Sequence, residues 1–268
     1  KALVDLASSP SVLGVALSGE RGLVVFPDGP STMRAVAVTS DGTPGPSRTL
    51  GLDNAEGLRV VAAVGDRFVV VTDGPCVDGH TRCLNALLLD PVGASIGAPV
   101  VVRGHAPIAR IRRHTTDEAL LLAFSTDDGP PWVDSFIRTA GGLVHARHPL
   151  TRVPRHVKQD EVLAITGTHA RFSVLHRLGS AEDPDGALVL ESGTGSAIIE
   201  ALEEAAMIER FVLDGEGFGI IASFEFDRPL ALRVRADGTL AAPARRIEGD
   251  APLPPPFDNA LMAQLVDD

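Results

Sequence analysis

Ala35-Val36-Ala37-Val38-Thr39-Ser40-Asp41-Gly42 combines a strand-forming segment with a glycine turn at its end. The same combination recurs four more times along the chain, in residues 86–93, 134–142, 187–193 and 231–238. The turn glycines Gly42, Gly93, Gly142, Gly193 and Gly238 are spaced by 51, 49, 51 and 45 residues. A period of this length, filled with short strands, is typical of a repeat protein in which each repeat is one supersecondary unit.

Each repeat contains an earlier hairpin, whose second strand is a dense apolar run typical of a strand buried on both faces. These runs are residues 23–26, 68–71, 119–124, 172–175 and 218–224. The first strands of the hairpins are expected near residues 13–17, 60–64, 108–112, 162–165 and 207–213. After each glycine turn comes a more polar strand, expected at residues 48–52, 98–102, 143–150, 197–202 and 240–247.

This gradient from buried to exposed strands resembles the blades of a β-propeller. The resemblance implies an all-β fold, a single β-propeller domain over residues 1–268 with five four-stranded antiparallel blades. The blades are expected at about 12–56, 57–107, 108–156, 157–205 and 206–249, with residues 1–11 and 250–268 providing closure or a tail. The alternative is that the chain is part of a six- or seven-bladed propeller. The Asp-Gly hairpins resemble those of secreted bacterial propellers, but the WD40 and kelch signatures are absent, so the resemblance concerns architecture alone.

One segment conflicts with this pattern. Residues 196–209 carry Ile198, Leu202 and Ala206 on one side of a helical projection, and Glu200 and Glu203 on the other. That spacing is typical of an amphipathic helix. Because tertiary context often overrides local propensity, we expect a strand here, as the repeat predicts.

Charge and hydropathy limit the classes of partner. The chain carries a net charge of −11, which disfavours nucleic acid and anionic membranes, because both require basic patches. No apolar run reaches the ~18 residues that a membrane-spanning helix needs. The chain begins at Lys1 without a signal peptide, so we expect a mature or trimmed chain, and we expect a monomer.

The two cysteines, Cys76 and Cys83, enclose a short loop with an Asp78-Gly79 turn signal. An isolated pair of this kind predicts a disulfide and therefore an extracytoplasmic location: secreted, periplasmic or surface-attached. His80 lies between them, so a Cys-His-Cys metal site is the alternative, and two free buried thiols are the third reading.

Acidic residues recur in the loops expected between the second and third strands of the blades. Propeller topology brings these loops to one face, together with the loops that join successive blades. We therefore predict a partner-binding surface, or alternatively an ordinary solvated surface. Its candidate residues are Asp73, Asp78, Asp127, Asp128, Asp183 and Asp185, with Trp132 as an aromatic anchor unless it packs at a blade edge.

No cofactor is predicted, and the signals for a metal are weak. Glu182, Asp183 and Asp185 precede Gly186 and offer a possible Ca²⁺ site, although the spacing is not that of an EF-hand. His145 and His148 are three residues apart, which places them on opposite faces of a strand and does not favour a shared metal.

Two functions of different class are compatible with these features. The first is an extracytoplasmic binding or scaffold module that recognises a partner protein through its acidic loop face. The alternative is a propeller-type glycan hydrolase that uses carboxylates at the channel mouth, with candidates at Asp53, Asp160, Glu161, Glu203 and Glu204. One Trp, no Tyr and 4% aromatic residues disfavour stacking of sugar rings, so the sequence does not positively support an enzyme.

Overall fold

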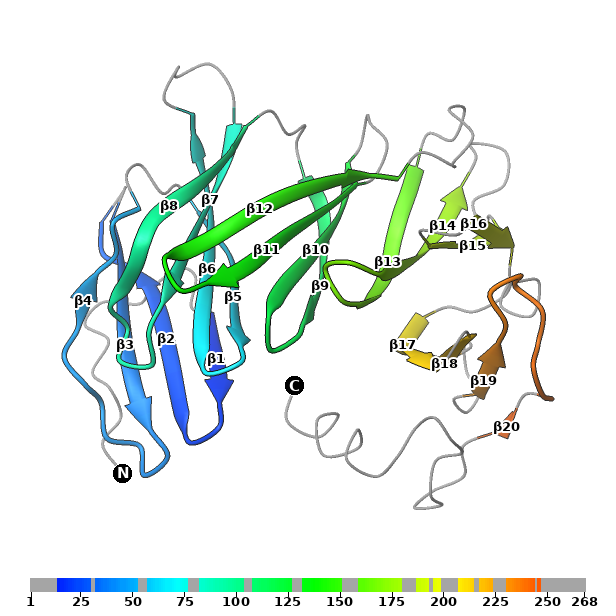
Figure 1. Cartoon of the computed structure of the whole chain (residues 1–268), viewed down its shortest axis with the longest axis horizontal. Coiled ribbons are helices and arrows are strands. Elements are labelled where there is room, and N and C mark those ends of the chain that lie inside the picture. The colour runs from blue at the N-terminus through cyan, green and yellow to red at the C-terminus, as the bar shows by residue number, and fades with distance from the viewer. Residues whose placement is uncertain are drawn as a thin grey trace. The chain divides into compact units, whose positions relative to one another are not determined.

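The computed structural model describes residues 14–29, 32–52, 57–76, 82–103, 108–126, 132–150, 159–179, 187–192, 195–198, 207–214, 217–223, 230–243 and 245–246. Within these residues every helix or strand assigned is a β-strand, and the strands form five separate sheets of four (Figure 1). The all-β prediction is confirmed.

Each sheet consists of four strands that follow one another in the sequence, and every registered strand pair is antiparallel. The first sheet contains β1 (Gly14–Ser18), β2 (Arg21–Pro27), β3 (Met33–Thr39) and β4 (Arg48–Thr49). The second contains β5 (Gly57–Val64), β6 (Arg67–Pro75), β7 (Arg82–Leu89) and β8 (Ser95–Arg103). The third contains β9 (Ile108–Thr115), β10 (Ala119–Thr126), β11 (Trp132–Thr139) and β12 (Gly142–Pro149). The fourth contains β13 (Gln159–Gly167), β14 (Phe172–Gly179), β15 (Ala187–Ser192) and β16 (Gly195–Ile198). The fifth contains β17 (Met207–Asp214), β18 (Gly217–Ser223), β19 (Leu230–Val234) and β20 (Arg245–Arg246).

The sheets follow the sequence repeat. Each lies within one of the five expected repeat units, and each expected first strand overlaps β1, β5, β9, β13 or β17. The conflicting segment forms strand at both described ends, because β16 includes Ile198 and β17 begins at Met207. Residues 199–206, which carry the rest of the helical pattern, lie outside the described residues. Strand β16 is therefore placed slightly earlier than the sequence predicts.

Three of the five glycine turns that revealed the repeat share one geometry, whereas Gly142 has a φ of +139° and Gly193 lies outside the described residues. Gly42, Gly93 and Gly238 have φ angles of +83°, +79° and +85°, a left-handed backbone that glycine adopts without steric cost. In each turn the glycine N–H donates to the carbonyl oxygen three residues earlier, at 2.8, 3.0 and 3.0 Å. Asp41 and Asp237 add a side-chain bond, because their Oδ1 atoms accept the amide of the threonine two residues later at 3.0 Å. The turns therefore set the hairpins between third and fourth strands.

The chain divides into two compact units, and the division passes through the third sheet. The first unit holds Lys1–Pro107, Thr115–Leu121 and Asp134–Arg147, and the second holds Ile108–His114, Leu122–Val133 and His148–Asp268. The expectation of a single domain stays a prediction.

In the first unit, the middle strands of sheets one and two form a common core. Leu23 and Val25 of β2 pack in one cluster with Phe68 of β6 and Leu87 of β7, all almost completely buried. Strand β1 lies beside β5. Burial of apolar area at this contact, at roughly 25 cal/mol per Å², is the main force that holds the two sheets together.

In the second unit, sheets four and five are joined in the same way. Leu175 of β14 and Leu190 of β15 pack with Phe211, Phe218 and Ile220 of the fifth sheet. Strand β13 lies beside β17. Sheet-on-sheet contact through the middle strands, with first strands side by side, is therefore common to both units.

Candidate functional site

Most of the acidic residues predicted to bind a partner lie outside the described residues. These are Asp78, Asp127, Asp128, Asp183 and Asp185, together with Glu182 of the possible Ca²⁺ site. Their roles stay predictions. The structure does describe Asp73, Trp132 and both cysteines, and it places Asp73 and the cysteines together at one end of the second sheet.

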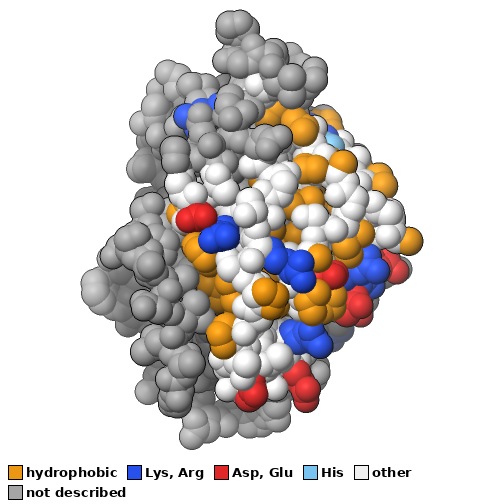
Figure 2. Space-filling model, turned by 90° about the vertical axis from the view of Figure 1, so that its left-hand side faces the viewer, with side chains coloured by type: hydrophobic (Ala, Val, Ile, Leu, Met, Phe, Trp, Pro, Cys, Tyr) orange, Lys and Arg blue, Asp and Glu red, His pale blue; other side chains and the backbone are white. Residues whose placement is uncertain are grey.

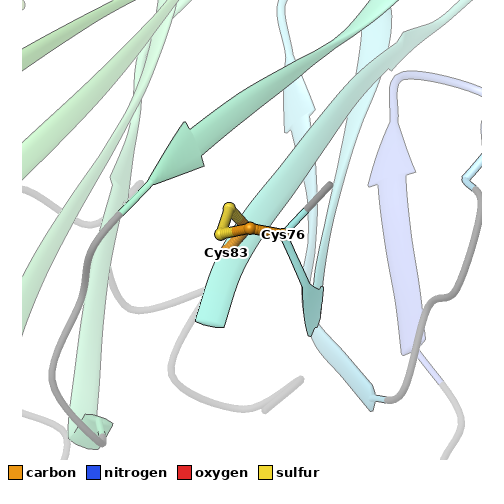
Figure 3. The surroundings of a disulfide bond; sticks show 2 residues. All are labelled: Cys76 and Cys83. Carbon is orange, nitrogen blue, oxygen red and sulfur yellow. A yellow bond between two sulfur atoms is a disulfide. The ribbon is translucent and has the colours of Figure 1, made fainter. Parts of the chain in front are cut away.

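Cys76 and Cys83 form the predicted disulfide (Figure 3), with their Cα atoms 5.1 Å apart. Cys76 directly follows β6, and Cys83 is the second residue of β7, where it pairs with Gly74. Both cysteines are buried. The bridge therefore closes the base of the loop that connects the second and third strands.

The sequence predicted Asp73 in this loop, but the structure places it inside β6. There it pairs with Gly57 of β5 and Leu84 of β7. Gly74 and Pro75, which follow Asp73, also belong to the strand because both pair with β7. The Asp73 side chain is only 4% exposed. Its Oδ2 atom accepts hydrogen bonds from Arg59 Nη2 at 2.5 Å and from Arg82 Nη1 at 3.3 Å. A buried carboxylate is stabilised only when it is paired in this way.

A β-bulge brings Arg59 to Asp73. In the pairing of β5 with β6, Leu58 faces Thr72 and Val60 faces Val71, so Arg59 is an extra residue without a position of its own in the ladder. Such a bulge redirects a side chain and leaves the rest of the register intact. The surrounding strand is apolar, and this one residue turns a charged group toward the end of the sheet.

Bulges recur in the first strands of the fourth and fifth sheets. The extra residue is Leu163 in β13, between Val162 and Ala164, and Glu209 in β17, between Ile208 and Arg210. The carbonyl of Leu163 accepts a hydrogen bond from Arg112 Nε of β9 at 2.9 Å. Within the second unit, an arginine thus satisfies the backbone group that the bulge removes from the ladder.

Trp132 is the first residue of β11 and is 9% exposed, so the expectation of an exposed anchor in a loop is wrong. Its ring stacks on Phe124 with a centroid distance of 5.2 Å and an interplanar angle of 23°. The apolar environment of the end of β10 explains the burial, because a large aromatic ring contributes more stability there than in water.

A second buried carboxylate lies in the third sheet. Asp134 of β11 is completely buried, and its Oδ1 is 2.8 Å from His145 Nε2 and 2.9 Å from Arg147 Nε, both of β12. Arg147 Nη2 also donates to Oδ2 at 3.1 Å. His148, three residues after His145, has a different partner, the ring of Phe172 at 5.1 Å. The contacts of Asp134 with His145 and Arg147 therefore link β12, the outer strand, to β11.

Charge on the described surface is mixed. On the face shown in Figure 2, arginine and carboxylate side chains alternate around apolar ones. Asp28 and Arg34 form an ion pair of 3.4 Å in the first sheet, and Asp66 pairs with Arg138. Arginines that the prediction of an acidic face did not include pair with these carboxylates. A signal was present, since Arg59 interrupts the apolar run Gly57–Val64, and three arginines interrupt Ile108–Thr115.

In the part of the chain that the structure describes, no three His, Cys, Asp or Glu side chains are grouped as metal ligands would be. The same residues contain no helix that is long and apolar enough to cross a membrane.

The comparisons with known proteins find likeness in structure but not in sequence. No protein-family model matches the chain, and no curated protein matches it. A prolyl endopeptidase chain has a TM-score of 0.50 at 15% identity; the match covers 91% of this chain and 35% of that one. The β-propeller domain of the Trilobed protease from Pyrococcus furiosus has a TM-score of 0.35 at 10% identity, with 90% and 86% covered. Cobalt-substituted Synechocystis ACO has a TM-score of 0.47 at 10% identity, with 88% and 60% covered.

This chain thus spans about a third of the length of the prolyl endopeptidase. At 15% identity the likeness concerns the fold alone. Together with five four-stranded antiparallel sheets in sequence order, it assigns the chain to the β-propeller fold. The resemblance predicted from the repeat is confirmed at the level of architecture.

Proposed function

We propose that this chain is an extracytoplasmic binding module that recognises a partner protein through the loops between the second and third strands of its sheets. The contact residues proposed in these loops are Asp78, Asp127, Asp128, Asp183 and Asp185. Their carboxylates would meet basic groups of the partner, and the pairing would steer association more than it would add affinity.

One observation carries the proposal: the base of the loop in the second sheet is held rigidly. The Cys76–Cys83 disulfide closes it covalently, and the ion pairs of Asp73 with Arg59 and Arg82 hold the strands on either side. A loop whose two ends are joined in this way has fewer conformations to lose on binding, which favours affinity without a new contact. Binding residues are commonly found on loops that a rigid scaffold positions.

The disulfide also supports the proposed location. Structural disulfides form and persist in oxidising compartments and are rare in reducing ones. Both cysteines are buried near the buried carboxylate of Asp73, an environment typical of a structural disulfide and not of an exposed reactive thiol.

No observation on the described residues favours the hydrolase. A glycosidase needs two carboxylates that converge on one bond. Asp73 and Asp134, the two buried aspartates described, are each already held by arginine. Asp160 and Glu161 lie in β13, paired with Leu178 and Arg177, and the other candidates, Asp53, Glu203 and Glu204, lie outside the described residues.

The proposal is tested by a charge-matched pair of variants. The first is D78N/D127N/D183N/D185N, which changes at least one residue in each proposed loop. The second is E20Q/D117N/D214N/E216Q, which lies in the sequence where first strands lead into second strands and changes the net charge equally. Partners are captured by cross-linking from an extracytoplasmic fraction, and the affinity of the captured protein is then measured for all forms at low and high salt.

We expect the first variant to weaken binding and reduce its salt dependence, and the second to behave as the wild type, since screening acts on the charges that are in contact. Thermal stability should stay unchanged in both. Equal affinity of the two variants would contradict the proposal. Turnover of a glycan panel by the wild type would establish the hydrolase instead.

A further inference from the structure

Two arginines share one buried carboxylate at the loop end of the second sheet. Arg59 and Arg82 both donate to the same oxygen, Oδ2 of Asp73, at 2.5 and 3.3 Å. Two arginines and one aspartate give this cluster a net charge of +1, whereas the whole chain has a net charge of −11. Among the described residues, other close pairs such as Arg34 with Asp28 contain one arginine for each carboxylate.

Both guanidinium groups have hydrogen-bonding capacity to spare. Each presents five N–H donors in a planar fork, and the bond to Asp73 occupies one nitrogen of each. The side chain of Arg59 is 33% exposed and that of Arg82 is 56% exposed, whereas Asp73 is only 4% exposed. The carboxylate is thus buried, while both arginine side chains are partly open to solvent.

The two arginines are held from opposite sides. The bulge between Leu58 and Val60 turns Arg59 toward Asp73, and Arg82 directly precedes Cys83, whose disulfide fixes the start of β7. Two flexible side chains would normally lose much rotamer entropy when a ligand orders them. Here the strand, the disulfide and the shared aspartate have already restricted them.

We propose that Arg59 and Arg82 form a binding site for a carboxylate group, either a free small carboxylic acid or an acidic group of a peptide. A planar carboxylate can accept two N–H donors from one guanidinium, or one from each, and these charge-assisted bonds are stronger than neutral ones. Asp73 is the positioning residue, because its Oδ2 atom holds both guanidinium groups close enough to bind one carboxylate together. The site does not require the acidic loops to bind a partner.

The test uses the intact protein labelled with ¹⁵N and follows the Nε–Hε signals of its arginines by NMR. Sodium acetate and N-acetylglycine are titrated as a free acid and as a peptide-like terminal carboxylate. Sodium chloride at equal ionic strength controls for screening, and sodium sulfate serves as a tetrahedral anion. The signals are assigned by their absence in R59Q and R82Q.

We expect the signals of Arg59 and Arg82 to shift saturably with both carboxylates but not with chloride. R82Q should raise the dissociation constant at least about tenfold, the effect of losing one charge-assisted bond. R82K, which keeps the charge but loses the fork, should weaken binding less. R34Q removes an arginine of similar exposure from a one-to-one pair and should leave the affinity unchanged. R82Q is the principal variant because Arg59 still pairs with the buried aspartate in it.

Three results would overturn the inference. The first is a linear shift that chloride reproduces. The second is an equal loss of affinity in R34Q and R82Q. The third is saturable binding of sulfate without binding of either carboxylate. A response to N-acetylglycine alone would identify a peptide terminus as the occupant, and a response to both carboxylates would identify the carboxylate group itself.

Discussion

Loss of the Cys76–Cys83 disulfide should lower the free energy of unfolding by about 2.5 kcal/mol. The two residues are seven apart in sequence, so the bridge closes a loop of about eight residues. The entropy that such a bridge removes from the unfolded chain is roughly 2.1 + 1.5R ln n, or about 8 cal/mol/K for this loop, which gives the stated value at 25 °C.

The assay is urea unfolding followed by far-UV circular dichroism, with three forms of the protein. Reduced wild type isolates the effect of the bridge, because its side chains are unchanged. C76A/C83A also removes two buried sulfur atoms and should therefore be the least stable form. The reasoning is refuted if reduced and oxidised wild type unfold at the same urea concentration, or if the unreduced, unfolded protein contains two titratable thiols.

Three further predictions concern the sheets and turns. Trp132→Ala should cost about 3–5 kcal/mol in thermal or chemical unfolding, because it truncates a buried, stacked ring; unchanged stability would restore the view that Trp132 is an anchor. Gly97→Ala should destabilise the protein more than Gly42→Ala, which should cost about 1 kcal/mol. Both glycines have a positive φ, but a Cβ at Gly97 would collide with the Gly141 carbonyl, whereas the space at Gly42 is open. The comparison fails if the two midpoints fall by equal amounts. Hydrogen bonds from the Thr39 side chain, then from the Thr43 backbone, lower the pKa of Asp41, and bonds from the Thr239 side chain and backbone lower the pKa of Asp237. The stabilisation that these two carboxylates contribute is therefore complete above the unfolded pKa near 3.8 and is lost as the pH falls through the lower folded pKa values. The urea midpoint of D41N/D237N should therefore fall less steeply with acid than that of the wild type. Parallel curves would contradict this prediction.

The fold was predictable from the sequence because its signals are local and repeat. A turn glycine needs a positive φ wherever a hairpin of this type occurs, and Gly42, Gly93 and Gly238 have one. The repeat also predicted the strands on either side of the ambiguous segment, since β16 ends at Ile198 and β17 begins at Met207. For residues 199–206, which lie outside the described residues, the expected strand stays a prediction.

The candidate site was less predictable because it depends on register. A bulge is a relation between two strands, so nothing in the run around Arg59 indicates that this residue is the extra one. Asp73 was expected in a loop because it follows the apolar run of residues 68–71, but the ladder with β7 continues past it. Trp132 follows two prolines and was expected to be exposed, although the partner that buries it, Phe124, lies on a different strand.

The bulges in β5, β13 and β17 have a consequence for insertions and deletions. In a regular strand, loss of one residue turns every later side chain to the opposite face of the sheet. At Arg59, Leu163 and Glu209 the opposite holds, because the residues on either side already pair with consecutive residues of the neighbouring strand. Deleting any one of the three would join those neighbours into an uninterrupted ladder with every side chain on its present face. Each of these three strands can therefore lose one interior residue without a change of register, which a regular strand cannot.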